Sequence, residues 1–97
     1  MVETNGVHHL LVTVGAHHKL SGMAPKGIRV VSGGHLDLRG VAGRVTVEEG
    51  ATARIHGMVT GGLYNMGGDV EVYGMVHDGV HDLGETTSRI APGAVIS

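Results

Sequence analysis

The sequence predicts an all-β fold, a short single-domain parallel β-solenoid: a three-sided β-helix of about five coils with 17 to 18 residues each. Three observations lead to this prediction. Aliphatic residues recur at that period, glycines recur in step with them, and apolar and polar residues alternate within each segment. No stretch of the sequence sustains the i, i+3, i+4, i+7 pattern of an amphipathic helix.

Three columns of small or aliphatic residues run through the five segments. The segments open at Leu11, Ile28, Val45, Leu63 and Val80. The second column is Leu20, Leu38, Ile55, Val72 and Ile90. The third column is Ala24, Ala42, Val59, Val76 and Ala94. Stacked strands are about 4.8 Å apart, so five coils predict a height of about 24 Å.

A corner position lies two residues after the second column. It holds Gly22, Gly40, Gly57, Gly74 and, in the last segment, Pro92. Glycine is expected there if the chain turns through a positive φ, or if stacked corners leave no room for a side chain. We expect residues 1–10 to form an N-terminal cap or pairing strand, and residues 11–97 to form the solenoid. A small antiparallel β-sandwich or barrel is the alternative fold, because its strands also alternate and end in glycine.

Composition limits the classes of partner. The formal net charge is -2, no run of basic residues occurs, and there are two tyrosines but no phenylalanine or tryptophan, which disfavours nucleic acid. Glycines interrupt every apolar stretch before it reaches membrane-spanning length, so no membrane partner is expected. The chain has no cysteine and no basic-then-apolar leader, which predicts a cytoplasmic location.

The stretches VEVYGMVHDGV and VTVEEGATARIHGMVTGG resemble bactofilins, the bacterial polymer-forming cytoskeletal proteins. Their core repeats V-x-V-x-G-x-V-x-G-x-V along a right-handed three-sided β-helix. The resemblance covers about residues 28–97, and it implies a self-assembling structural protein. Bactofilins flank this core with polar tails that often carry a membrane-targeting segment, whereas the coils here start by about residue 11 and run to Ser97.

An apolar stripe is the candidate interaction surface. The residues that follow the corner glycines are Met23, Val41, Met58 and Met75. If they point outward, they form with Tyr73 an exposed face suited to a protein partner. The alternative is that the corner turns this column inward as core. The apolar pair Val95 and Ile96 predicts contacts at the C-terminal end of the solenoid.

The histidines and carboxylates predict no catalytic or metal site. His18 and His35 are the candidate ligand pair on neighbouring coils, but the next coil offers only Thr52 or Ala53 as a third partner. The set His77, Asp78, His81 and Asp82 is more typical of solvated turns than of an acid/base site. Asn65 and Asp82 replace Val30 and Val47 in their column, and either hydrogen-bond between coils or mark the end of the apolar stack.

These observations predict a non-enzymatic structural or protein-interaction module without cofactors. We expect a homo-oligomer that self-associates through the solenoid ends or through the Met/Val face. The alternative is a small inhibitor or immunity-type protein that uses this face to bind and block one protein partner.

Overall fold

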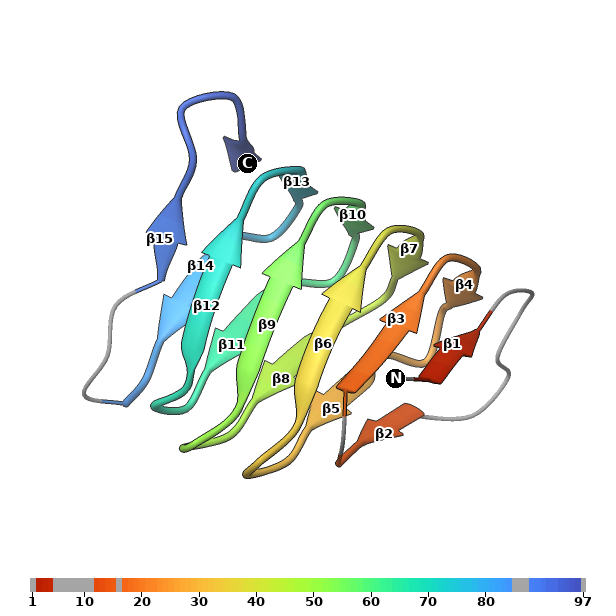
Figure 1. The fold of residues 1–97 in the computed structure, drawn as a ribbon. Coiled ribbons are helices and arrows are strands. Elements are labelled where there is room, and N and C mark those ends of the chain that lie inside the picture. Colours follow the sequence, from red (N-terminus) through yellow and green to blue (C-terminus); the bar gives the residue numbers. More distant parts are fainter. Residues whose placement is uncertain (1, 5–11, 16, 85–87, 97) are drawn as a thin grey trace.

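The computed structural model describes residues 2–4, 12–15, 17–84 and 88–96. Within these ranges the chain forms short strands joined by turns and bends. The strands stack into three sheets that wind around one core (Figure 1). No helix occurs among the described residues, so none there is long and apolar enough to cross a membrane.

Each sheet collects one strand from every coil. Sheet A contains β1 (Val2–Thr4), β3 (His17–Leu20), β6 (His35–Leu38), β9 (Thr52–Ile55), β12 (Asp69–Val72) and β15 (Arg89–Ile90). Sheet B contains β4 (Met23–Ala24), β7 (Val41–Ala42), β10 (Met58–Val59), β13 (Met75–Val76) and β16 (Val95–Ile96). Sheet C contains β2 (Val12–Val14), β5 (Ile28–Val30), β8 (Val45–Val47), β11 (Leu63–Asn65) and β14 (Val80–Asp82).

The chain passes through sheets C, A and B in turn, once for each coil, and every strand pair in the described ranges is parallel. The predicted parallel β-solenoid of about five coils is therefore confirmed, and the antiparallel alternative is wrong. At the N-terminal end β1 precedes the first coil and pairs with β3. The remainder of the predicted 1–10 segment, apart from these three residues, lies outside the described residues.

The register of the first coil differs from the prediction. Val12, not Leu11, is the partner of Ile28, and Leu11 itself lies outside the described residues. Ile28 in turn pairs with Val45, and Leu63 with both Val45 and Val80. The first coil is thus shorter along this side than the later ones, and a fixed period misplaces its opening residue by one position.

The core is a narrow stack of aliphatic side chains. In the second column Leu20, Leu38, Ile55 and Val72 are fully buried, each paired with its neighbour above and below. Ala24, Ala42, Val59 and Val76 are fully buried in the third column. Side chains alternate across each strand, which places the intervening residues outside.

Steric exclusion explains the corner glycines. A Cβ atom on Gly57 would lie 1.9 Å from the carbonyl oxygen of Gly40, and one on Gly74 would lie 2.1 Å from that of Gly57. Neither glycine is among those with positive φ. Glycine is therefore required here because successive corners stack in backbone contact, which selects the second of the two explanations that the sequence left open.

The last corner follows a different path. Val95 pairs with Met75 and Ile96 with Val76, so Ile96 occupies the third column where Ala94 was predicted. This corner is longer than the others and contains a turn in which the Ala94 amide donates to the Ala91 carbonyl at 3.0 Å. The extra residues of this turn, around Pro92, shift Ala94 to the position of a corner glycine.

A polar cluster replaces the aliphatic column of sheet C near its end. Asn65 is fully buried and pairs with Val47 on one side and Asp82 on the other. Its Nδ2 donates to Asp82 Oδ1 at 3.2 Å, and its Oδ1 accepts the amides of Gly67 at 3.1 Å and Gly68 at 2.8 Å. The Ser88 hydroxyl also donates to Asp82 Oδ1, at 2.7 Å. Both Asn65 and Asp82 therefore take part in hydrogen bonds between coils.

Candidate functional site

The outward column of sheet B is apolar along its whole length. Backbone pairing aligns Met23, Val41, Met58, Met75 and Val95. Met23 and Val95 are exposed at the two ends of the column, and the three residues between them are half-buried. In each strand of sheet B up to β13, the residue that follows belongs to the third column and faces the core. The Met/Val column therefore does not point inward.

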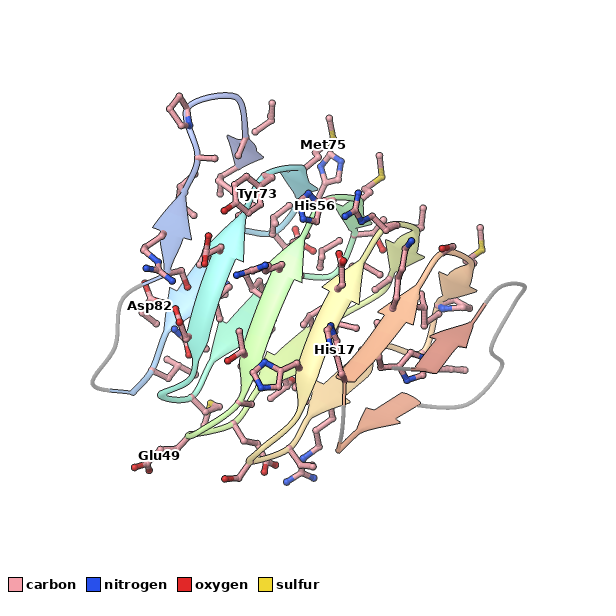
Figure 2. All side chains as sticks on the ribbon, in the orientation of Figure 1. His17, Glu49, His56, Tyr73, Met75 and Asp82 are labelled. Atoms are coloured by element: carbon pink, nitrogen blue, oxygen red, sulfur yellow. The ribbon has the colours of Figure 1, made fainter. Side chains whose placement is uncertain are left out.

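A groove runs beside this column along the stacked corners. Its lining includes Gly57 and Gly74, with Met58 and Met75 on one side and Tyr73 on the other. Figure 2 shows Met75 near His56 and Tyr73 at this corner. The rings of His56 and Tyr73 stack with centroids 4.8 Å apart and an interplanar angle of 5°. The groove therefore has flexible methionine side chains on one side and the aromatic ring of Tyr73 on the other. The corner glycines between them contribute no side chain.

The aromatic wall is tied to the neighbouring sheet. The Tyr73 hydroxyl donates a hydrogen bond to Glu71 Oε2. This bond, together with Arg89 and Arg54 and against a smaller effect of desolvation, lowers the pKa of Glu71. The same bond is the main reason that the pKa of Tyr73 is raised. Tyr73 is thus held at the corner through a carboxylate of sheet A.

A column of charges crosses the outer face of sheet A. Pairing aligns Lys19, Asp37, Arg54, Glu71 and Arg89, so that the charge changes sign at every step. Arg89 Nη2 lies 2.9 Å from Glu71 Oε1, and Arg54 Nε lies 3.9 Å from the same oxygen. Opposite charges on adjacent strands attract and like charges repel, which favours the alternation.

The sequence interpretation missed this charge column. Its signal is present in the repeat, because each member directly precedes a residue of the second aliphatic column. It becomes visible only when the charges of neighbouring coils are compared with each other. Within one coil, Arg54 is an ordinary exposed residue and Glu71 is an ordinary half-buried one.

The histidine pair differs from the predicted one. His35 pairs with His17, whereas His18 pairs with Leu36. The physical reason is that this part of sheet A steps by one more residue than the predicted spacing, which moves His18 toward the inner side of the strand, where it is half-buried. The His17 and His35 rings are 5.9 Å apart.

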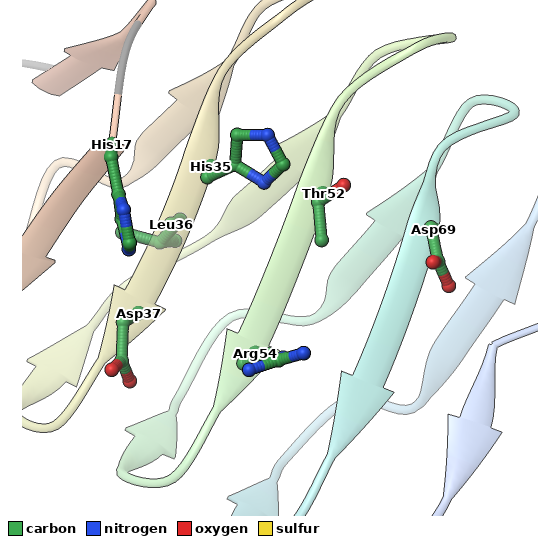
Figure 3. Close-up of a pocket in the computed structure, with 7 residues that line it drawn as sticks. All are labelled: His17, His35, Leu36, Asp37, Thr52, Arg54 and Asp69. Atoms are coloured by element: carbon green, nitrogen blue, oxygen red, sulfur yellow. The ribbon is translucent and has the colours of Figure 1, made fainter.

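The histidine column continues into Thr52 and Asp69 (Figure 3). Together with Asp37 and Arg54 these residues line a polar groove on sheet A. Across the described residues, no group of three His, Cys, Asp or Glu side chains is arranged to hold a metal ion. The groove mixes basic and acidic groups without a common focus.

The His/Asp stretch that follows β13 and runs through β14 is divided among separate contacts. The His81 ring stacks on Tyr64 with centroids 4.7 Å apart, and its Nε2 lies 2.9 Å from the Asp78 carbonyl oxygen. Asp78 itself has a φ of 65°, as expected in a tight turn. Asp82 belongs to the polar cluster with Asn65, so these side chains do not converge on one point.

The C-terminal end of the solenoid exposes residues of core columns. Ile90 is 44% exposed and Ile96 is 37% exposed, whereas Val72 and Val76 directly below them are fully buried. Beside them Val95 is 50% exposed. β15 and β16 form the outermost strands of sheets A and B at this end (Figure 1).

Comparisons with protein-family profiles, with curated proteins and with solved structures found no significant match to this chain.

Proposed function

We propose that this protein is a non-enzymatic scaffold that self-associates through an open end of its β-solenoid, as bactofilin-like proteins do. The observation that carries the proposal is the exposure of Ile90 and Ile96 in columns that are fully buried elsewhere. Full burial of one such side chain contributes about 1.5–3 kcal/mol. A second copy that stacks on this end would bury the part of each side chain that is still exposed to water. It would thereby gain the corresponding part of this free energy.

The unpaired strand edges support the same proposal. Beyond β15 and β16 no further strand follows among the described residues, so their outer N–H and C=O groups have no neighbour in the sheet. Such edges serve as templates for another strand, and natural solenoids either cap them or use them for assembly. The described part of the chain shows no cap over β15 and β16.

The experiment measures mass by multi-angle light scattering over a range of protein concentrations. We expect the mass to rise with concentration for the natural sequence and to stay monomeric for Ile90→Lys combined with Ile96→Lys. Ser32→Lys, at an exposed corner away from this end, is the matched control and should associate like the natural protein. A natural protein that is monomeric at every concentration contradicts the proposal.

The groove beside the Met/Val column favours a second candidate, an inhibitor or immunity-type protein that binds one protein partner there. Exposed apolar columns with methionine suit protein contacts. The double variant Met58→Lys, Met75→Lys distinguishes the candidates. If it folds and still self-associates, the column is not used for assembly and is available to another protein. If it folds but becomes monomeric, the face itself is the self-association surface.

A further inference from the structure

The corner that joins sheet B to sheet C is shorter in one coil than in the others. It spans residues 25–27 between β4 and β5, residues 60–62 between β10 and β11, and residues 77–79 between β13 and β14. Between β7 and β8 it consists of Gly43 and Arg44 alone. This short corner therefore lies between two longer ones, those of residues 25–27 and 60–62.

A pocket of about 400 Å³ lies at the short corner, within the range of about 300–1,000 Å³ that small-molecule sites occupy. Its lining comes from three successive corners, namely Pro25 and Lys26, Gly43 and Arg44, and Thr60 and Gly61. A Cβ atom on Gly43 would lie 2.2 Å from the Pro25 carbonyl oxygen, and one on Gly61 would lie 2.6 Å from that of Gly43. Stacked backbone thus excludes side chains at both glycines, and neither position fills the pocket.

The charged residues of this lining are both cations, Lys26 and Arg44. The other four arginines of the chain each form an ion pair with a carboxylate. Lys19 is the strand partner of Asp37. Across the part of the chain that the structure describes, no ion pair involves Lys26 or Arg44. A chain of net charge -2 therefore keeps a local excess of positive charge at this corner.

The Arg44 side chain is oriented by an aromatic ring of sheet C. Its guanidinium carbon lies over the Tyr64 ring, 5.0 Å from the centroid. A guanidinium that packs on a ring face keeps its N–H donors at its edge, in a planar fork that matches two oxygens of a carboxylate or a phosphate. Contact with Tyr64 thus restricts Arg44 before a ligand binds, which lowers the entropic cost of binding.

We propose that this pocket binds a phosphoryl group between the Arg44 guanidinium and the Lys26 ammonium. A phosphomonoester carries a charge of about −1.5 to −2 at pH 7, so it offsets both cations, whereas a carboxylate offsets one. Arg44 supplies a two-pronged contact and Lys26 a point charge. The Thr60 hydroxyl donates to the Ala42 carbonyl oxygen at 3.3 Å, so the two cations provide the recognition. The site is independent of the proposed self-association.

A titration followed by NMR tests the site, with inorganic phosphate and glycerol phosphate as probes at constant ionic strength. A local signal is needed because phosphate salts also stabilise proteins without a specific site. We expect the Gly43 and Gly61 amide signals to shift and to saturate with a dissociation constant of about 1–10 mM, as for a few solvent-exposed contacts. Acetate, which offers one negative charge to the same fork, should bind at least about 5-fold more weakly.

Single variants identify the groups that bind. Arg44→Gln should weaken phosphate binding about 5-fold or more, and Lys26→Gln about 3-fold. Because Arg44→Gln also loses its contact with Tyr64, Lys26→Gln is the second test, at a residue that does not touch this ring. Arg54→Gln and Lys19→Gln are the matched controls. They remove the same charges from sheet A and should leave phosphate binding unchanged.

The outcomes distinguish a phosphoryl site from general attraction. Equal weakening by Arg44→Gln and Arg54→Gln would mean that only the net charge matters, and would overturn the site. Acetate that binds as tightly as phosphate would overturn the phosphoryl specificity. No saturating shift of the Gly43 and Gly61 amides up to about 50 mM phosphate, well above the expected constant, would overturn binding at this corner. Tighter binding of glycerol phosphate supports a phosphorylated metabolite as the ligand, and equal binding supports free phosphate.

Discussion

The third and fifth coils are built on the same columns, yet their aliphatic side chains have different surroundings. Ile55 and Val59 of the third coil are fully buried, while Ile90 and Ile96 of the fifth coil are 44% and 37% exposed. The residue types are equally apolar, so the difference comes from the neighbouring coil. In a solenoid the next coil completes the burial of each coil, and the last coil is left incomplete unless something covers it.

The two coils also differ in their corners. In the third coil Gly57 stacks directly over Gly40, with no room for a Cβ atom. In the fifth coil the corner carries extra residues, and a Cβ atom on Gly93 would meet nothing within 4 Å. A corner inside the stack is constrained from both sides, whereas the terminal corner is constrained from one side only.

The largest expected effect comes from a methyl group at an inner corner. Gly57→Ala would place Cβ against the Gly40 carbonyl oxygen, and we expect it to prevent folding or to cost more than about 4 kcal/mol of unfolding free energy. Gly93→Ala, the matched change in the last coil, should alter stability by less than about 0.5 kcal/mol. Urea denaturation of both variants provides the measurement. Equal losses would contradict the distinction between inner and terminal corners.

Truncation of the second aliphatic column should have the next largest effect. Ile55→Ala removes fully buried atoms between two coils, and we expect a loss of about 3 kcal/mol. Ile90→Ala should cost less than about 1.5 kcal/mol in the monomer, because part of the side chain is already in water. Denaturation at low protein concentration isolates the monomer. If Ile90→Ala proved as costly as Ile55→Ala, then something other than a second copy would cover this end.

The buried Asn65 should contribute less. Asn65→Ala removes the acceptor for the Gly67 and Gly68 amides and should cost about 2 kcal/mol, because buried amides lose their partner. Asn65→Leu restores an aliphatic side chain at this position, like Val47 in the coil before. Thermal denaturation should show both variants to be less stable than the natural protein. A leucine variant of unchanged stability would show that the column needs only apolar volume.

The smallest expected effect is on the acid dependence of stability. The pKa of Glu71 in the folded chain is held below its usual 4.5, mainly by the Tyr73 hydroxyl. A lowered folded-state pKa stabilises the fold above pH 4.5, and this contribution is lost as the pH falls through the folded-state value. Tyr73→Phe should therefore reduce the decrease in melting temperature between neutral and acid pH.

Tyr64→Phe serves as the control for this experiment, because the Tyr64 ring contacts His81 and Arg44 and not a carboxylate. Its melting temperature should follow the same acid profile as that of the natural protein. An equal change in both variants would mean that the Glu71 hydrogen bond does not set the acid dependence.

Much of the fold follows from the order of residues along the chain. The second aliphatic column is correct in all five coils, since Leu20, Leu38, Ile55, Val72 and Ile90 are paired as the period predicts. The errors lie at the two ends. The period predicts Leu11 where Val12 lies and Ala94 where Ile96 lies, because a fixed period cannot register a short first coil or a longer last corner.

Less of the candidate site could be predicted. The alignment of Met23, Val41, Met58 and Met75 followed from the repeat. Met23 is exposed and the other three are half-buried, so the exposure of the column could not be read from the repeat alone. The pairing of His35 with His17, and not with His18, depends on the local step between two strands. A histidine displaced by one residue faces the other side of its strand, so this small error of register changes the site completely.

The sequence by itself determined the period, the three columns and the glycine corners, because these depend on local alternation and on which residues a stacked corner can hold. The tertiary structure alone decided which residues are neighbours across coils. The alternating charges from Lys19 to Arg89, the hydrogen bond of Asn65 with Asp82 and the exposure of Ile90 all depend on parts of the chain that lie a full coil apart. Such contacts arise only when the coils stack in register. The number of residues in each coil then decides which residues of neighbouring coils lie side by side.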